Sequence, residues 1–234
     1  MQKKIIRAGK YLFCLFLFFL IFSLSAVRIS AQEIVDKTVA TINDGSRTIP
    51  ELITYSDLLW QLALQHDKPI APPNSEDLNS ALQALIDQRL IGLEADRLPS
   101  IAPTKAEIDA EIKRVRLLFS SDAEFERRLR SVGFNSVTVE NFQKIMRQRV
   151  AIEKYLDFRF RSFVVITPED EARYYREVFV PDFRKRNPGL LMPTLNETRA
   201  QINQILTERK IEEDIEKFLD DAKRRANVEI LFEV

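Results

Sequence analysis

Few residues of this chain belong to the types that catalyse reactions or bind metals. The sequence contains one histidine, His66, and one cysteine, Cys14. Cys14 lies in an apolar N-terminal segment that we expect to be removed, so the mature chain would have no thiol for a disulfide, a metal site or a nucleophile. We interpret His66, at the expected end of a helix, as a surface residue, with a pH-sensing or ligand role as the alternative. The sequence therefore predicts no catalytic residue, no cofactor and no metal site.

Charged residues occur in clusters, and each cluster has a simple structural interpretation. The adjacent acids Glu212 and Glu213 lie on an expected helix face, so we interpret them as solvated rather than as an acid/base pair. Arg159 and Arg161 alternate with aromatic residues, a pattern found in nucleic-acid-binding proteins. However, residues 32–234 contain 30 basic and 35 acidic side chains, and this net negative charge argues against nucleic acid as a partner. Glycine-rich phosphate-binding motifs are absent, so the activity should not depend on ATP.

Two short segments carry residues that could bind a peptide. Arg149 falls on an otherwise apolar helical stripe, near Met146. It is either a core-edge residue that snorkels or pairs with a carboxylate, or a polar point inside a groove. Residues 190–192 form an apolar triplet in a loop with proline and glycine, which either fastens to the core or presents an adaptable apolar surface. The predicted peptide-binding residues are Met146, Arg149, Leu190, Leu191 and Met192.

The elements that must position these residues are mostly helices. A hydroxyl residue precedes a carboxylate by three positions at Thr104, Ser121 and Thr194, which is a helix-start signature. Thr167 precedes a proline at the first helical position, where the missing N–H costs nothing. Apolar residues at helical spacing follow each start. Gly133 should end one helix in the left-handed conformation.

Strand patterns occur mainly near the two ends of the sequence. Residues 37–42 and 47–53 flank an Asp-Gly turn pair, and residues 228–232 form a third apolar run. Because a short isolated strand leaves its backbone groups without partners, we expect the third run to pair with the hairpin. The sequence therefore predicts a mostly α fold with a small β element formed by an N-terminal hairpin and a C-terminal strand.

Residues 1–31 have the three parts of a secretory signal peptide. A cationic start precedes an apolar run at residues 11–22, after which the sequence becomes small and polar up to Ala31. The run is shorter than the roughly 20 residues that span a bilayer. We predict cleavage after Ala31 and a periplasmic location. The alternative is an uncleaved anchor that extends to Val27, with Arg28 as its flank, and membrane contact is expected only in that case.

The order of these segments resembles the N-terminal chaperone domain of SurA-type periplasmic proteins. The resemblance is carried by residues 35–43 (VDKTVATIN), 52–58 (LITYSDL), 81–91 (ALQALIDQRLI), 101–108 (IAPTKAEI) and 125–133 (FERRLRSVG). Residues 209–218 (RKIEEDIEKF) and 228–231 (VEIL) are similar to the family's C-terminal helix and strand, which fold back onto the N-terminal domain.

The chain departs from that family between these two parts. SurA-type proteins usually carry parvulin isomerase domains there, whereas this chain has only residues 167–193. A domain needs about 50 residues or more to form its own core. We therefore expect a signal peptide (1–31), a SurA N-terminal-like domain (32–166), a short helix and loop in place of the parvulin insertion (167–193), and a C-terminal helix and strand (194–234).

The resemblance implies an ATP-independent periplasmic chaperone, a holdase, that binds unfolded or extended segments of outer-membrane or other envelope proteins. Without a parvulin domain, we expect no isomerase activity and no other enzymatic activity. One alternative is an assembly or structural factor, periplasmic or membrane-anchored, with one dedicated partner. Another is an enzyme with an unrecognised site, against which the scarcity of histidine, cysteine and glycine argues.

Overall fold

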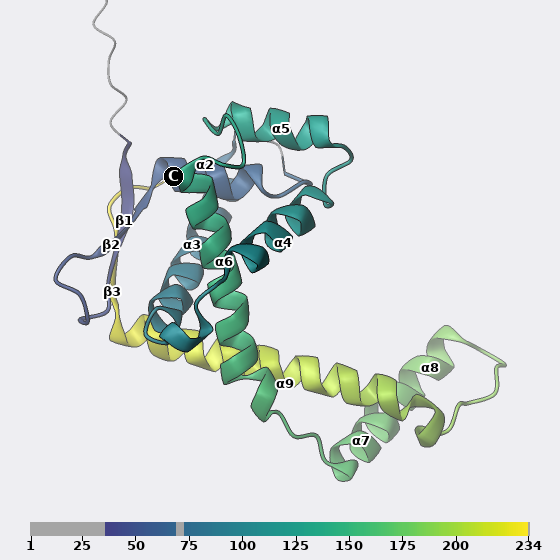
Figure 1. The fold of residues 1–234 in the computed structure, drawn as a ribbon. Helices are drawn as coiled ribbons and strands as arrows, with labels where there is room; N and C mark the ends of the chain where they lie inside the picture. The colour runs from purple at the N-terminus through teal and green to yellow at the C-terminus, as the bar shows by residue number, and fades with distance from the viewer. Residues whose placement is uncertain (1–35, 69–72, 234) are drawn as a thin grey trace, which may run out of the picture. The chain divides into compact units, whose positions relative to one another are not determined.

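A computed structural model describes residues 36–68 and 73–233, and these residues are mostly helical with one small antiparallel sheet (Figure 1). The strands are β1 (Thr38–Asn43), β2 (Glu51–Thr54) and β3 (Asn227–Ile230). The α-helices are α2 (Tyr55–Ala63), α3 (Ser75–Ala95), α4 (Lys105–Arg116), α5 (Asp122–Ser131), α6 (Glu140–Arg159), α7 (Pro168–Tyr174), α8 (Val180–Arg186) and α9 (Leu195–Arg225). Short helices of other types are η1 (Pro99–Ile101), η2 (Arg161–Phe163) and the π-helical η3 (Tyr175–Phe179). The predicted fold class is confirmed, while the predicted signal peptide lies outside the described residues.

Helices α4, α5, α7 and α9 begin at the capping residues that the sequence indicates. At four starts the threonine hydroxyl accepts the N–H three residues later, and the acid at that position accepts the threonine's own N–H. These capping boxes lie at Thr54, Thr104, Thr167 and Thr194. Ser121 caps α5 through its hydroxyl. Gly133 has a φ of +90°, so the left-handed conformation predicted after α5 is confirmed.

The sheet joins the two ends of the described chain. Its order is β2-β1-β3, and β1 runs antiparallel to both neighbours. Ala40 lies opposite Ile230, and Ile42 lies opposite Val228. The predicted pairing of the C-terminal strand with the hairpin is therefore confirmed. The hairpin loop spans residues 44–50, which is longer than the two-residue turn that the Asp-Gly pair suggests.

Three apolar clusters form the core. The first lies between the sheet, α2 and α3, and includes Ala222 of α9. The second joins α4, α5 and the start of α6 around a group of phenylalanines. The third joins the ends of α3 and α6 to α9 through Ile211 and Phe218. Because α9 contributes to the first and third clusters, it ties the sheet to the helices.

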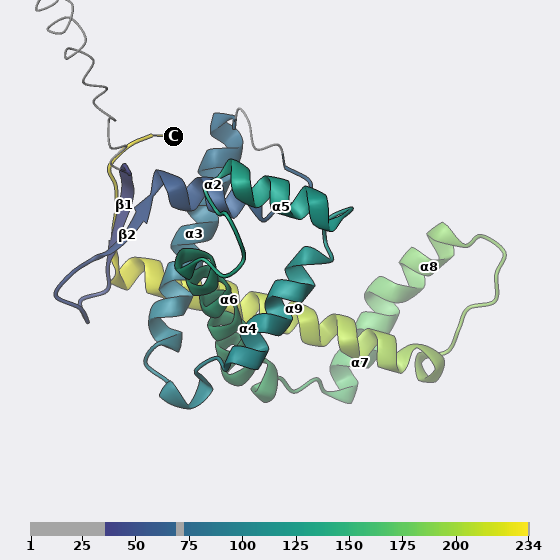
Figure 2. The ribbon, with the colours of Figure 1, turned by 45° about the horizontal axis from the view of Figure 1, so that its top comes forward.

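The segment between α6 and α9 forms an arm along the first half of α9 (Figure 2). We use "arm" for α7, η3, α8 and the loop up to residue 194. Glu171 of α7 accepts a hydrogen bond from Asn203 (2.9 Å) and pairs with Arg199 (3.2 Å), both on α9. Helix covers more of residues 167–193 than the single short helix that the sequence suggests, and the interval, all of it described, contains no strand.

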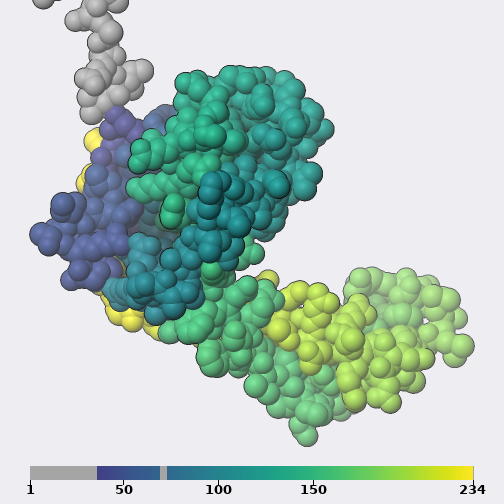
Figure 3. All heavy atoms as spheres, viewed as in Figure 1, coloured from purple at the N-terminus to yellow at the C-terminus, as the bar shows by residue number. Residues whose placement is uncertain are grey.

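The arm stands clear of the lobe formed by α4 and α5, and the surface between them is hollowed (Figure 3). Of the helices in residues 36–68 and 73–233, none is both long and apolar enough to cross a membrane.

Candidate functional site

A groove of about 710 Å³ opens between α2, α3, α4, α6 and α9. Helices from distant parts of the sequence therefore form its walls. Its lining combines apolar, amide and charged side chains: Gln61, Leu64, Gln65, His66, Asp67, Gln88, Arg114, Leu118, Arg149, Ile152, Glu153, Leu156, Asp157, Arg161, Ile211 and Ile215.

The floor of the groove is apolar. Ile152 and Leu156 lie one turn apart on α6, and Ile211 and Ile215 lie one turn apart on α9, so each pair presents one continuous helix face. All four belong to, or pack against, the third core cluster. Leu118, just after α4, is 51 % exposed at the edge of the groove. An apolar side chain of a bound peptide could therefore lose much of its contact with water here.

The side chains of three glutamines in the groove lining have no hydrogen-bond partner among the described residues. The side chains of Gln61 on α2, Gln65 just after it and Gln88 on α3 make no hydrogen bond to any other described residue. A glutamine side chain offers two N–H donors and a carbonyl acceptor, the same kinds of group that an extended peptide backbone presents. These amides can therefore bind a main chain whatever its side chains are.

A network of charged residues forms the wall between α4 and α6. Glu111 is buried and accepts from Arg149 Nε (3.0 Å) and Arg114 Nε (2.6 Å). Arg114 also pairs with Glu153 (2.9 Å), and its hydrogen bond to Glu111 raises the pKa of its guanidinium. The groove lining contains three arginines and three acids besides His66, so its charges balance. Selection of a ligand by net charge is therefore not expected in the groove.

Arg128 of α5 holds one edge of the groove in place. Its Nε donates to the carbonyl of Ala63 (3.0 Å), and its Nη2 donates to those of Leu62, Gln65 and Lys68. These carbonyls belong to the end of α2 and the turn after it, where a helix leaves its last acceptors unpaired. Burial lowers the pKa of this guanidinium. Sequence reasoning missed Arg128 because its acceptors are 60–66 residues away in the chain.

The residues predicted from the sequence occupy three different environments. Arg149 pairs with the carboxylate of Glu111, as one interpretation expected, and it also lines the groove, where its contact with a peptide stays a prediction. Met146 is fully buried in the second core cluster, and a surface ligand could reach it only if that core opened. Leu190 and Leu191 are exposed in the loop of the arm, and Met192 is partly buried there. None of these three lines the groove. Their contact with a peptide stays a prediction.

His66 lies at the edge of the groove, with its ring edge-on to Phe119 at a centroid distance of 6.4 Å. The described part of the chain contains no group of three or more His, Cys, Asp or Glu residues that could hold a metal ion. The groove lining offers a ligand apolar contact, hydrogen bonding and ion pairing.

No family model matches the chain. It is similar to the Foldase protein PrsA of two Clostridium perfringens strains, with 26 % identity to each over 184 residues. The aligned region covers 73 % of this chain and 52 % of each relative, so the chain spans about half the length of these curated relatives. The similarity relates the chain to protein-folding factors, and it does not single out the SurA-type N-terminal domain.

Proposed function

We propose that this chain is an exported, ATP-independent chaperone that holds unfolded segments of outer-membrane or other envelope proteins in the groove. The observation that carries the proposal is the apolar floor beside the three unpartnered glutamine amides. The floor favours apolar side chains, and the amides can bind the main chain between them. Together they recognise an unfolded chain by its general chemistry, and the similarity to a foldase supports this direction.

The size of the groove suits weak and exchangeable binding. Removing about 400 Å² of apolar surface from water contributes roughly 10 kcal/mol. The loss of rotational and translational freedom, together with peptide ordering, offsets a large part of this gain. Because this cost is at least about 4 kcal/mol, the remaining ~6 kcal/mol corresponds to dissociation constants of tens of micromolar or weaker.

We propose further that the chain holds its clients without isomerising their prolyl bonds. Holding requires only a surface that competes with aggregation, whereas isomerisation requires a barrier of about 18–20 kcal/mol to be lowered. The relatives named as foldases are about twice as long as the region they share with this chain. The rate of a proline-limited refolding reaction should stay unchanged when the protein is added, and catalytic acceleration would contradict this part of the proposal.

The N-terminal sequence supports export. We propose cleavage after Ala31, so the mass of the mature protein should correspond to a chain that starts at Gln32. Recovery of the intact chain only in membranes would favour the anchored alternative.

The central test compares two adjacent leucines. Leu118→Glu places a charge in the groove, whereas Leu117→Glu makes the same change one residue earlier, at a side chain that is 84 % exposed and does not line the groove. Because both positions are exposed, both variants should fold, and thermal unfolding checks this. We expect L118E to weaken binding of an aromatic-rich unfolded peptide about tenfold and L117E to leave it unchanged.

The same variants should be compared in suppressing aggregation of an unfolded outer-membrane protein. Equal behaviour of the two variants would refute the assignment to this groove. If the wild-type protein shows neither peptide binding nor suppression at tens of micromolar, the holdase proposal is wrong. A single tightly bound envelope protein would then support the dedicated-partner alternative.

A further inference from the structure

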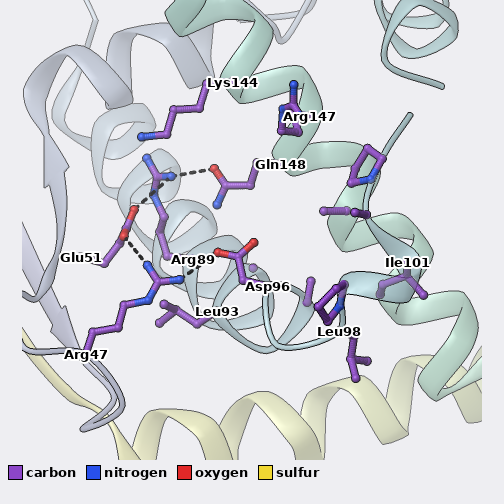
Figure 4. A pocket seen from close by; sticks show the side chains of 16 residues that line it. Arg47, Glu51, Arg89, Leu93, Asp96, Leu98, Ile101, Lys144, Arg147 and Gln148 are labelled. Carbon is purple, nitrogen blue, oxygen red and sulfur yellow. Dashed lines mark hydrogen bonds and ion pairs between the residues drawn. The ribbon is translucent and has the colours of Figure 1, made fainter. Parts of the chain in front are cut away.

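A second pocket, of about 330 Å³, lies on a different face of α6 from the groove (Figure 4). Lys144, Arg147, Gln148 and Ala151 share this face because they are spaced by three or four residues. The opposite walls come from the hairpin, from the second half of α3 and from the connector that contains η1.

The pocket carries an excess of positive charge. Its lining has four cationic and two acidic side chains: Arg47, Arg89, Lys144, Arg147, Glu51 and Asp96. Both acids are already engaged, since Arg47 pairs with Asp96 (2.8 Å) and Glu51 (3.3 Å), and Arg89 also pairs with Glu51 (3.4 Å). Within the described residues, Lys144 and Arg147 have no ion-pair or hydrogen-bond partner. The lining therefore has a net charge of +2, which favours an anion.

The unpartnered Lys144 lies beside a guanidinium that is already paired, because Arg89 contacts Glu51 (3.4 Å) and Asp57 (3.6 Å). The Lys144 amine points toward the guanidinium of Arg89 (Figure 4). The Arg89 side chain is only 12 % exposed, and its buried Nε has no hydrogen-bond partner in the described structure. Gln148 accepts from Arg89 Nη1 at 2.6 Å. A side chain at Gly92 would come within 3.0 Å of the Gln148 amide, so the glycine gives Gln148 room to make this contact. The result is a cationic corner that can accept one small anion.

The rest of the pocket is apolar. Leu93, Leu98, Ile101 and Ala151 line it beside the cationic corner. The volume is at the lower end of the range for ligand pockets. A ligand that fits both parts has one negative group with an apolar group directly attached.

We infer that this pocket binds the free C-terminal carboxylate of a client chain that ends in an apolar residue, an inference that rests on the proposed chaperone function. The carboxylate accepts a charge-assisted hydrogen bond from Lys144, while Arg147 adds positive charge to the lining, and the last side chain lies against Leu93, Leu98 and Ile101. An Asp or Glu side chain within a client carries the same anionic group. However, the main chain of such a client continues on both sides of the acidic residue. A pocket of this volume has room for one chain end and not for a continuing chain.

The test uses three ten-residue synthetic peptides and the full mature protein. The first ends in leucine with a free carboxylate, the second has the same sequence with a C-terminal amide, and the third is amidated but carries an aspartate before the leucine. Fluorescence anisotropy gives their affinities. We expect the first peptide to bind about tenfold more tightly than the second, which corresponds to ~1.4 kcal/mol. The third should bind like the second.

The double variant K144A/R147A should abolish the difference between the free acid and the amide. Both side chains are exposed, so the protein should still fold. The matched control is K113A/R127A, which removes two exposed cations on α4 and α5 that form no ion pair with any described residue and line neither the groove nor the pocket. This control should keep the full difference.

Three results would overturn the inference: equal binding of acid and amide, tight binding of the aspartate peptide, or loss of the difference in the control variant. These failures are distinct from failure of the proposed function. If both peptide forms bind equally and L118E weakens both, the groove is correct and only the pocket inference is wrong. If no form binds, the proposed function fails as well.

Discussion

Replacing Arg128 by methionine should destabilise the protein and loosen one edge of the groove. Methionine keeps an apolar stem of similar length but removes the guanidinium, which donates to four carbonyls at and beyond the end of α2. Three of those carbonyls share Nη2, so the four bonds are not independent. Only Nε and Nη2 are engaged, and we therefore treat the interaction as two charge-assisted donors.

A hydrogen bond to a charged group contributes about 1.5–3 kcal/mol. Because the site is only partly buried, water can donate to some of the carbonyls that Arg128 leaves. We therefore expect a decrease of about 3 kcal/mol in the free energy of unfolding. Arg128→Lys keeps the positive charge but has no planar fork, so it should recover about half of this loss. Arg127→Met is the same change at an exposed arginine that forms no ion pair with a described residue, and its free energy of unfolding should stay within about 0.5 kcal/mol of the wild-type value.

Urea unfolding followed by circular dichroism measures these differences, and the slope of the transition should stay constant across the variants. Amide hydrogen exchange should accelerate at residues 64–68, the turn after α2 in which Arg128 binds the carbonyls of Gln65 and Lys68. A loss below about 1 kcal/mol, or a loss equal to that of R127M, would refute the reasoning. Because Gln65 lies in this turn, R128M should also weaken peptide binding at temperatures where the protein remains folded.

Two further predictions concern acid stability and the sheet. The hydrogen bond from Lys154, together with those from Thr104, lowers the pKa of Glu107 from 4.5 to about 2. The ionised Glu107 carboxylate therefore stabilises the folded state fully above pH ~4.5, and this contribution is lost as the pH falls toward 2. The urea midpoint should accordingly fall less between pH 5 and 2 in E107Q than in the wild type. E140Q, at an acid that pairs with no described cation, should follow the wild type. Equal curves for E107Q and the wild type would contradict this assignment. Deleting residues 227–234 removes β3 and should accelerate amide hydrogen exchange at residues 39–42 of β1, whereas deleting only residues 233–234 should not. Unchanged protection after the longer deletion would show that β3 does not protect β1.

The parts of the fold that could be predicted depend on local signals. A threonine three residues before an acid specifies its own hydrogen bonds, so Thr104 and Thr194 could be assigned as helix starts from the sequence. The pairing of β1 with β3 is not local. It could nevertheless be predicted, because few strand candidates were left over and each needed a partner.

The groove depends on what distant residues leave unpaired. Nothing in the sequence distinguishes Gln61, Gln65 and Gln88 from glutamines whose amides have partners. Helical periodicity places Met146 and Arg149 near the same stripe, but it cannot tell which of them the second cluster buries and which one Glu111 draws to the groove wall. Leu190 and Leu191 have the composition of a core latch, and their exposure follows from the position of the arm's loop.

The two proposed binding regions differ in charge, and this difference assigns them different roles. The groove is balanced in charge and has free amides, so it should bind main chain and apolar side chains with little dependence on sequence. The pocket has an apolar wall and two cations that are unpaired among the described residues, so it should bind the carboxylate at a chain end. Both use α6, but on different faces, since Ile152 and Leu156 face the groove while Lys144 and Gln148 face the pocket. Substitutions on one face should therefore leave binding at the other unchanged, because sites without shared partners contribute nearly additively.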